Sequence, residues 1–359
     1  MSFSTNMPFS TKNFLLSLDD ILTKNQLTED QQAAHFPIAF SLTVDTLVIE
    51  TLIIETLTAD ALTKNMQETG NVSNQELVVF TNLPVNTLLA LQTVGSLTIQ
   101  TLNAVNTRNN QTSCRFNIIC DDFIKSRKAI ADYALAQNID VALIDNAPTL
   151  AQAGLLVMDM DSTTIEIECI DEIAKLAGVG KQVAEVTELA MQGELDFAQS
   201  LHQRVATLAN SPEQILADVA KNIPLMAGLE TLIIELKKHN WRIAIASGGF
   251  TYFADHLKEL LDLDATFANV LEIVNGKLTG KVLGSVVDAQ VKADSLKILA
   301  EKYQIPASQT VAMGDGANDL IMMKAAAFGV AFHAKPIVLA QADSAINQQG
   351  LDCLLHWLA

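Results

Sequence analysis

Basic residues are scarce in this sequence. Its 359 residues include 23 Lys and Arg against 41 Asp and Glu, which gives a net charge of −18 at pH 7. Sequence-independent binding of nucleic acid needs a basic surface, so this balance argues against a nucleic-acid partner. Solubility is a sufficient reason for the excess of negative charge. A phosphorylated metabolite can still bind where a metal ion or a single Lys or Arg reverses the sign locally.

Cysteine is also rare, and its placement argues against both disulfide bonds and zinc sites. The four cysteines are Cys114, Cys120, Cys169 and Cys353. None forms a Cys-X-X-Cys pair, and no histidine stands at zinc-ligand spacing from them, so the pattern favours free thiols in a reducing compartment. The sequence also shows no secretory signal and no apolar run of membrane-spanning length. We therefore expect a cytoplasmic protein with no membrane partner.

Aromatic residues make up only 5% of the chain, although 49% of its residues are hydrophobic. The core is therefore expected to consist mainly of Leu, Ile, Val and Ala. The length suggests two or three domains. Residues 1–75 form an N-terminal segment whose structure the pattern does not define.

Residues 76–146 show a clearer pattern. Apolar alternation and amphipathic periodicity predict the order strand, helix, strand, strand, helix, strand, with the second strand over 97–105 and the third over 115–120. This order is the ferredoxin-like (ACT-like) α+β plan. Small domains of this kind often bind regulatory ligands, but no ligand motif is visible here. We keep a regulatory domain, or one that mediates a homodimer, as a hypothesis for this segment.

The most informative stretch follows this segment. The apolar run Leu155–Met158 predicts a buried strand, and it ends in Asp159 and Asp161, separated by one methionine. The carboxyl ends of strands in an open α/β sheet border the crevice where ligands bind. Two carboxylates there suit a hard cation such as Mg²⁺, and they also suit a nucleophile paired with a general acid. Taken alone, the motif fits an ordinary turn equally well.

The rest of the chain strengthens the first of these interpretations. Residues 165–225 are mostly helical in pattern, as expected for a helical cap inserted after the first strand. Strands and helices then alternate to the end of the chain, which predicts a doubly wound parallel sheet over residues 154–359. Within this region Asn275-Gly276, between apolar runs, predicts a hairpin. Polar groups follow three of the predicted strands or open the next helix. They are Asp159 with Asp161, Ser247 with Gly248 and Gly249, Lys292, and Asp315 with Asn318 and Asp319.

This combination resembles the four motifs of the haloacid dehalogenase superfamily in residue type, order and spacing. The resemblance covers residues 154 to about 336. It is carried by Val157-Met-Asp-Met-Asp-Ser-Thr, Glu166-Ile-Glu-Cys-Ile-Asp-Glu-Ile-Ala, Gly193-Glu-Leu-Asp-Phe, Ala246-Ser-Gly-Gly-Phe and Met313-Gly-Asp-Gly-Ala-Asn-Asp. It is strongest to the phosphatase branch that acts on O-phosphoserine. It implies Mg²⁺-dependent hydrolysis of O-phospho-L-serine to L-serine and phosphate, the last step of L-serine biosynthesis.

The resemblance also implies roles for individual residues. Asp159 is expected to attack phosphorus and to carry an aspartyl-phosphate, while Asp161 protonates the leaving oxygen and then activates water. Mg²⁺ is expected to bind Asp159, Asp315 and the backbone carbonyl of Asp161, with Asp319 orienting these ligands. Phosphate is expected to bind Ser247, Gly248, Lys292 and Asn318. The substrate's amino group is expected to pair with Glu168 and its carboxylate with Arg204, while Met191 and Phe197 close the site from the cap.

Other readings stay open at this point. Without the motif context, Glu168 and Arg204 would be a solvated ion pair, and Met191 and Phe197 would be core residues. A phosphatase or phosphotransferase acting on another small phosphorylated amino acid uses the same chemistry. A receiver-like signalling module also phosphorylates an aspartate, but it lacks a cap and needs no acid at position 161. A binding protein with a decayed enzyme domain is the third alternative, and the intact motif set argues against it.

Overall fold

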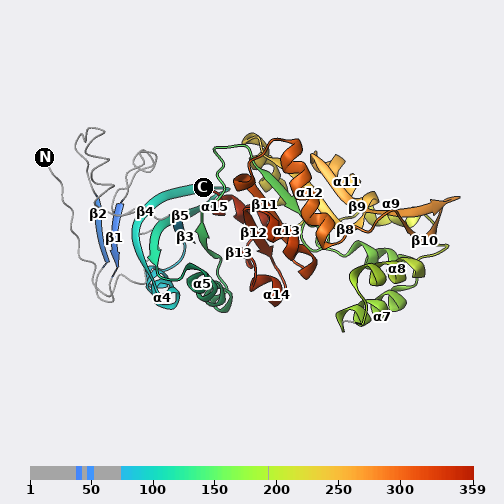
Figure 1. The fold of residues 1–359 in the computed structure, drawn as a ribbon, viewed down its shortest axis with the longest axis horizontal. Coiled ribbons are helices and arrows are strands. Elements are labelled where there is room, and N and C mark those ends of the chain that lie inside the picture. Colours follow the sequence, from blue (N-terminus) through green and yellow to red (C-terminus); the bar gives the residue numbers. More distant parts are fainter. Residues whose placement is uncertain (1–37, 43–46, 52–73, 193) are drawn as a thin grey trace. The chain divides into compact units, whose positions relative to one another are not determined.

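The computed structural model describes residues 38–42, 47–51, 74–192 and 194–359 (Figure 1). The chain divides into two compact units. The N-terminal unit comprises Met1–Ala147 with Leu355–Trp357, and the catalytic unit comprises Pro148–Leu354 with Leu358–Ala359. Most of segment 1–75 lies outside the described residues. Its described parts are strands β1 (Ile38–Leu42) and β2 (Leu47–Thr51), which pair antiparallel.

The described N-terminal unit contains a six-stranded antiparallel sheet with the order β2-β1-β4-β5-β3-β6. The predicted element order of residues 76–146 is confirmed. The elements are β3 (Gln75–Phe80), α4 (Val85–Gly95), β4 (Leu97–Arg108), β5 (Gln111–Cys120), α5 (Phe123–Gln137) and β6 (Val141–Asp145). Helix α5 begins at its N-cap Asp122, whose carboxylate accepts from the Lys125 amide, and it buries Ser126, Ile130 and Ala134 at four-residue spacing.

Strands β4 and β5 are longer than the sequence predicted. The prediction ended the first at Val105 and began the second at Arg115, whereas the structure continues the ladder to the pair Arg108 and Gln111. The turn between them is Asn109-Asn110, with φ values of 48° and 59°. Asparagine tolerates the left-handed region that a two-residue hairpin requires, so this dipeptide was a turn signal that the strand pattern alone did not use.

The catalytic unit contains the predicted parallel sheet. Its seven strands have the order β10-β9-β8-β7-β11-β12-β13, and all described pairs are parallel except the β9–β10 hairpin. The hairpin turns at Asn275-Gly276, as predicted, with both residues at positive φ. The strands are β7 (Leu155–Met158), β8 (Arg242–Phe250), β9 (Ala265–Val274), β10 (Lys277–Leu283), β11 (Thr310–Gly314), β12 (Phe328–Phe332) and β13 (Ser344–Ile346).

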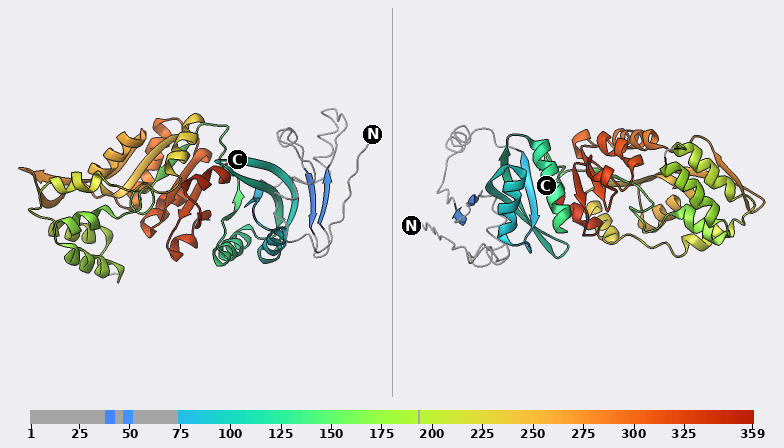
Figure 2. Two further views of the ribbon diagram at one scale, coloured as in Figure 1. Left: turned by 180° about the vertical axis from the view of Figure 1, so that it is seen from behind. Right: turned by 90° about the horizontal axis from the view of Figure 1, so that it is seen from below.

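Helices bury both faces of this sheet (Figure 2). Leu155 and Val157 of β7 pack in one cluster with residues of α12 (Ala289–Lys302) and α13 (Leu320–Ala325). The alternate residue Leu156 is equally inaccessible to solvent, as is Ile243 of β8, so the other face is covered too. The remaining long helices of the core are α10 (Leu229–Lys238) and α11 (Thr251–Leu261).

A helical segment is inserted after β7. The two ends of this insertion lie next to each other: Ile165 bridges Leu225, and the Met226 amide donates to the Thr164 carbonyl. Between these points lie α6 (Cys169–Leu176), α7 (Gly180–Met191), α8 (Phe197–Thr207) and α9 (Gln214–Ala220). Figure 1 shows α7 and α8 apart from the parallel sheet, and α8 contacts β10 of the hairpin. This segment forms the cap.

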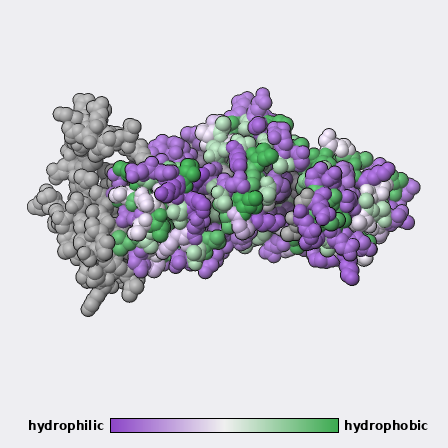
Figure 3. All heavy atoms as spheres, turned by 60° about the horizontal axis from the view of Figure 1, so that its bottom comes forward, coloured by the Kyte–Doolittle hydropathy of each residue, from purple (hydrophilic) through white to green (hydrophobic). Residues whose placement is uncertain are grey.

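The surface of the described residues is mixed in character. Figure 3 shows hydrophilic side chains interspersed with small hydrophobic patches on one face, which is usual for an exposed protein surface. None of the described helices combines the length and apolarity needed to cross a membrane.

Candidate active site

The parallel strands β7, β8 and β11 bring the sequence motifs to one edge of the sheet. Met158 lies opposite Ile245 of β8 and Met313 of β11, so the residues that follow these positions emerge side by side. A pocket lies at this edge. Its lining includes the predicted residues Asp159, Asp161, Glu168, Phe197, Arg204, Ser247, Gly248, Asp315 and Asn318.

The other predicted residues are placed differently. Lys292 and Asp319 are not among the residues that line the pocket. Both are fully buried, and Lys292 forms ion pairs with Asp159 and Asp319. Met191 ends α7, but its side chain lies outside the described part of the structure.

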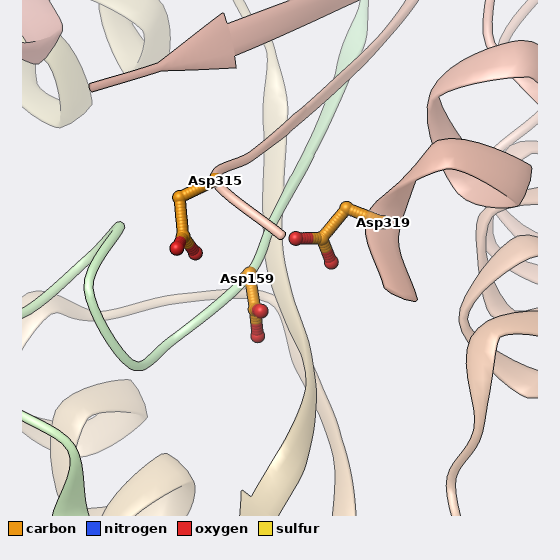
Figure 4. Close-up of side chains that lie close together, drawn as sticks. All are labelled: Asp159, Asp315 and Asp319. Carbon is orange, nitrogen blue, oxygen red and sulfur yellow. The ribbon is translucent and has the colours of Figure 1, made fainter. Parts of the chain in front are cut away.

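Three carboxylates meet at the base of the pocket. One oxygen each of Asp159, Asp315 and Asp319 lies within 4.8 Å of the other two (Figure 4). An all-oxygen, anionic donor set of this size suits a hard divalent cation such as Mg²⁺. Asp319 differs from the other two, because its Oδ2 accepts from the Gly316 amide at 3.0 Å and its Oδ1 accepts from Lys292. Its occupied oxygens favour a supporting role beside the metal ligands.

Lys292 provides the buried positive charge of this cluster. Its Nζ lies 2.8 Å from Asp159 Oδ2 and 2.7 Å from Asp319 Oδ1. Burial by itself lowers the pKa of Lys292, but the two facing carboxylates outweigh it and raise that pKa above its usual value. Lys292 therefore stays charged and holds Asp159 in place at the end of β7.

Asp161 has the electrostatics of an acid. Burial, followed by the negative charges of Glu168 and Asp159, raises the pKa of Asp161 to about 8. The Cys169 amide at the start of α6 donates to Asp161 Oδ1 at 3.1 Å, which fixes the carboxyl group. A carboxyl group that keeps its proton near neutral pH can give it to a leaving group.

Two glycines at the end of β8 allow other side chains of the site to approach closely. A Cβ on Gly248 would lie 2.5 Å from the Phe197 ring of the cap, and one on Gly249 would lie 2.8 Å from Asp161 Oδ2. Ser247 is buried, and its hydroxyl accepts from the Gly249 amide at 2.8 Å. Phe197 therefore closes directly over the loop, and the Ser247 hydroxyl proton remains available to a ligand.

The cap side of the pocket carries opposite charges. Glu168 is held by a 2.8 Å hydrogen bond from Ser162, which adopts positive φ (57°) at the turn into the cap. Burial raises the pKa of Glu168 and lowers that of Arg204. The buried Nε of Arg204 makes no hydrogen bond to any of the residues that the structure describes. A buried guanidinium N–H without a partner is costly and indicates a group supplied by a ligand.

Two polar residues of this region escaped the sequence analysis. Lys335 lines the pocket, and its charge opposes the burial that raises the pKa of Asp315. Lys335 follows strand β12, so the search for polar residues after predicted strands, which identified the other site residues, could also have found it. Asn269 lies within β9 and donates to the Gly248 carbonyl at 2.8 Å. No motif marked it, since one asparagine in an apolar strand resembles an ordinary turn or edge residue.

Known proteins are similar to this one in both sequence and fold. The family profile of haloacid dehalogenase-like hydrolases matches residues 154–327. The phosphoserine phosphatase of Vibrio cholerae is 60% identical over 216 residues, which cover 60% of this chain and 66% of that protein. The phosphoserine phosphatase of Haemophilus influenzae is 59% identical over 221 residues, 62% of this chain and 70% of that protein.

A solved structure extends the likeness to most of the chain. The crystal structure of a probable phosphoserine phosphatase from Vibrio cholerae, in its unliganded form, superposes with a TM-score of 0.68 at 45% identity. The superposition covers 84% of this chain and 93% of that one. The chain is thus a haloacid dehalogenase-like hydrolase. Within that class it belongs to the phosphoserine phosphatase family.

Proposed function

We propose that this protein hydrolyses O-phospho-L-serine to L-serine and phosphate with the help of Mg²⁺, the last step of L-serine biosynthesis. The main support is the charge pattern of one pocket. A carboxylate cluster with a buried lysine lies at its base, while Glu168 and the unpartnered Arg204 Nε face it from the cap. Glu168 and Arg204 are complementary to the amino and carboxylate groups of an amino acid. A divalent cation on the carboxylate cluster, together with Lys292, would attract a phosphate at the other end of the same molecule.

The reaction starts at Asp159. Its carboxylate attacks phosphorus, the bond to the serine oxygen breaks, and Asp161 gives its proton to that oxygen. Water then attacks the aspartyl-phosphate and gives a proton to Asp161, which releases phosphate and restores both carboxyl groups. Mg²⁺, held by Asp159, Asp315 and the backbone carbonyl of Asp161, would offset the negative charge of the bound phosphate.

The other residues hold the substrate still. Lys292, the Ser247 hydroxyl and the Gly248 amide donate to the phosphoryl oxygens, where charge grows in the transition state, and Asn318 binds at the same end. Arg204 grips the carboxylate in a planar fork, and Glu168 pairs with the amino group. Phe197 covers this end of the pocket and excludes water from it. The sequence motifs suggest the same role for Met191.

Phosphate release from L-phosphoserine tests this proposal. The panel contains L-phosphoserine, L-phosphothreonine and a sugar phosphate, each with Mg²⁺ and with EDTA, and Asp159→Asn serves as the inactive control. Selective, metal-dependent turnover of phosphoserine is expected. Equal turnover of all three phosphates would contradict the substrate assignment and leave only the chemistry. Absence of turnover, with stable phosphate on Asp159, would favour a signalling protein instead.

For the N-terminal unit we propose a ferredoxin-like (ACT-like) domain that regulates activity or mediates a homodimer. The support is its strand order β4-β5-β3-β6, with helices α4 and α5 as the crossovers. The mass of the full chain is measured by light scattering, and activity is measured with and without L-serine. A monomer whose activity does not respond to L-serine would contradict the proposal. A cytoplasmic location completes the proposed assignment.

A further inference from the structure

The regular pairing of β8 with β9 is interrupted at the phosphate-binding loop. Ala246 lies opposite Phe267, and the next pair is Phe250 with Asn269, so four steps along β8 match two along β9. The three residues between, Ser247 to Gly249, bulge out of the ladder. A bulge re-aims the chain but leaves backbone groups without their ladder partners.

The side chain of Asn269 replaces one of these partners. Asn269 is only 1% exposed, and its Nδ2 donates to the Gly248 carbonyl at 2.8 Å. That carbonyl shares a rigid peptide plane with the Gly249 N–H, which in turn donates to the Ser247 hydroxyl at 2.8 Å. Holding the carbonyl therefore sets the direction of the Ser247 hydroxyl through two hydrogen bonds.

The same side chain reaches a second part of the site. Asn269 Oδ1 accepts from the Val287 amide at 2.8 Å. Val287 directly precedes Asp288, the N-cap of α12, and the Lys292 amide donates to the Asp288 carbonyl at 3.0 Å. One buried amide thus joins the loop that carries Ser247 and Gly248 to the first turn of the helix that carries Lys292.

We propose that Asn269 is a positioning residue for the phosphoryl group: it fixes the Gly248–Gly249 peptide and holds the start of α12 at a set distance from it. The inference rests on the proposed function, because it assumes that Ser247, Gly248 and Lys292 hold phosphate. Asn269 itself touches neither substrate nor metal. An amide suits this position, since it offers both a donor and an acceptor on a flat group of this size and carries no charge at any pH.

Asn269→Ser is the decisive variant. Serine is neutral and too short to reach the Gly248 carbonyl, so the donor is lost without placing a new charge in the site. Gln309→Ser is the matched control. Gln309 is also buried (4% exposed) and bridges two segments, accepting from the Thr149 amide at 3.0 Å and donating to Gln152 at 3.3 Å, but it precedes β11 at the opposite edge of the sheet.

Four quantities are measured for each protein: kcat and KM for L-phosphoserine, the Kd of inorganic phosphate with Mg²⁺ by calorimetry, and the thermal unfolding midpoint. Both variants should lose stability to a similar degree. Only Asn269→Ser should also weaken phosphate binding and lower kcat, each by at least about tenfold, as is usual when a supporting hydrogen bond to a site is lost. If that variant does not fold, Asn269→Leu, which keeps the branched shape but has neither donor nor acceptor, must show the same losses.

The outcomes separate the two proposals. Phosphate binding within about twofold of wild type in Asn269→Ser, or an equal loss in Gln309→Ser, would overturn the positioning role. Wild-type protein that binds phosphate but does not turn over phosphoserine would contradict the proposed substrate and leave the role of Asn269 to the calorimetric comparison. Wild-type protein that binds no phosphate would overturn both.

Discussion

Replacing Lys292 by methionine tests the charge balance on which the site depends. Lys292 is fully buried, and its ammonium group lies 2.8 Å from Asp159 and 2.7 Å from Asp319. Methionine keeps the apolar stem but leaves these buried carboxylates without their cation. Removing one partner of a buried ion pair costs about 3–5 kcal/mol of folding stability, far more than the loss of a surface pair.

Tryptophan fluorescence can measure this cost in one unit alone. The chain has two tryptophans, with Trp241 in the catalytic unit and Trp357 in the N-terminal unit. In a Trp357→Phe background, thermal unfolding followed at Trp241 reports the catalytic unit. For a unit of about 200 residues, a loss of 3–5 kcal/mol lowers the midpoint by roughly 6–20 °C.

Lys238→Met is the matched control for this experiment. Lys238 pairs at 2.8 Å with Glu235 on the same helix, and its side chain is 62% exposed, so its removal should leave the midpoint unchanged. Mg²⁺ should restore part of the loss in Lys292→Met, because a divalent cation among the carboxylates offsets their charge and binds only the folded state. A midpoint lowered by less than about 3 °C in the absence of metal would refute the reasoning, since it would show that the carboxylates do not need this lysine.

Three further predictions concern catalysis. The turnover number should fall as the pH rises through about 8. Burial and the charges of Glu168 and Asp159 raise the pKa of Asp161 to about 8, and this acid must be protonated to act. A rate that stays constant well above that pH would contradict the assignment. Arg204→Lys should raise KM for L-phosphoserine at least about tenfold, because lysine lacks the planar fork of two N–H donors that holds a carboxylate. Turnover of phosphoethanolamine, which has no carboxylate, should be unaffected. Equal effects on both substrates would count against the carboxylate contact. Lys335→Gln should lower kcat/KM a fewfold at low ionic strength and have no effect at high salt, since an exposed cation at an acidic pocket acts by steering the anionic substrate toward it. Lys324→Gln is the control, and a loss that does not depend on salt would exclude steering.

The sequence predicted the parallel sheet of the catalytic unit and most of the residues that line its pocket, because the motifs occupy short contiguous stretches. Asp159 follows Leu155–Met158 directly, and Asp315 follows Thr310–Gly314 directly. Strand ends in a parallel sheet meet at one edge, so each motif needed only its own strand to be recognised. The hairpin at Asn275-Gly276 was predictable for a similar reason, since its signal is a single dipeptide.

Residues that act across long sequence distances were harder to predict. Asn269 lies 21 residues from Gly248, and its partner Val287 lies a further 18 residues on, so their contact depends on tertiary packing alone. The left-handed turn at Ser162, which directs that side chain to Glu168, also had no sequence signal, because serine rarely adopts positive φ. In the N-terminal unit, the extent of β4 and β5 depended on a turn of two asparagines that strand patterns do not weigh.

The most direct test of the central claim is to trap the phosphorylated residue during turnover. The protein is mixed with L-phosphoserine and Mg²⁺, quenched within a turnover, and treated with borohydride, which reduces an aspartyl-phosphate to homoserine. Mass spectrometry should then find the conversion at Asp159, and it should be absent when substrate is omitted. Steady release of phosphate with Asp159 unmodified at every time point, or conversion at Asp161 or Asp315 instead, would contradict the account.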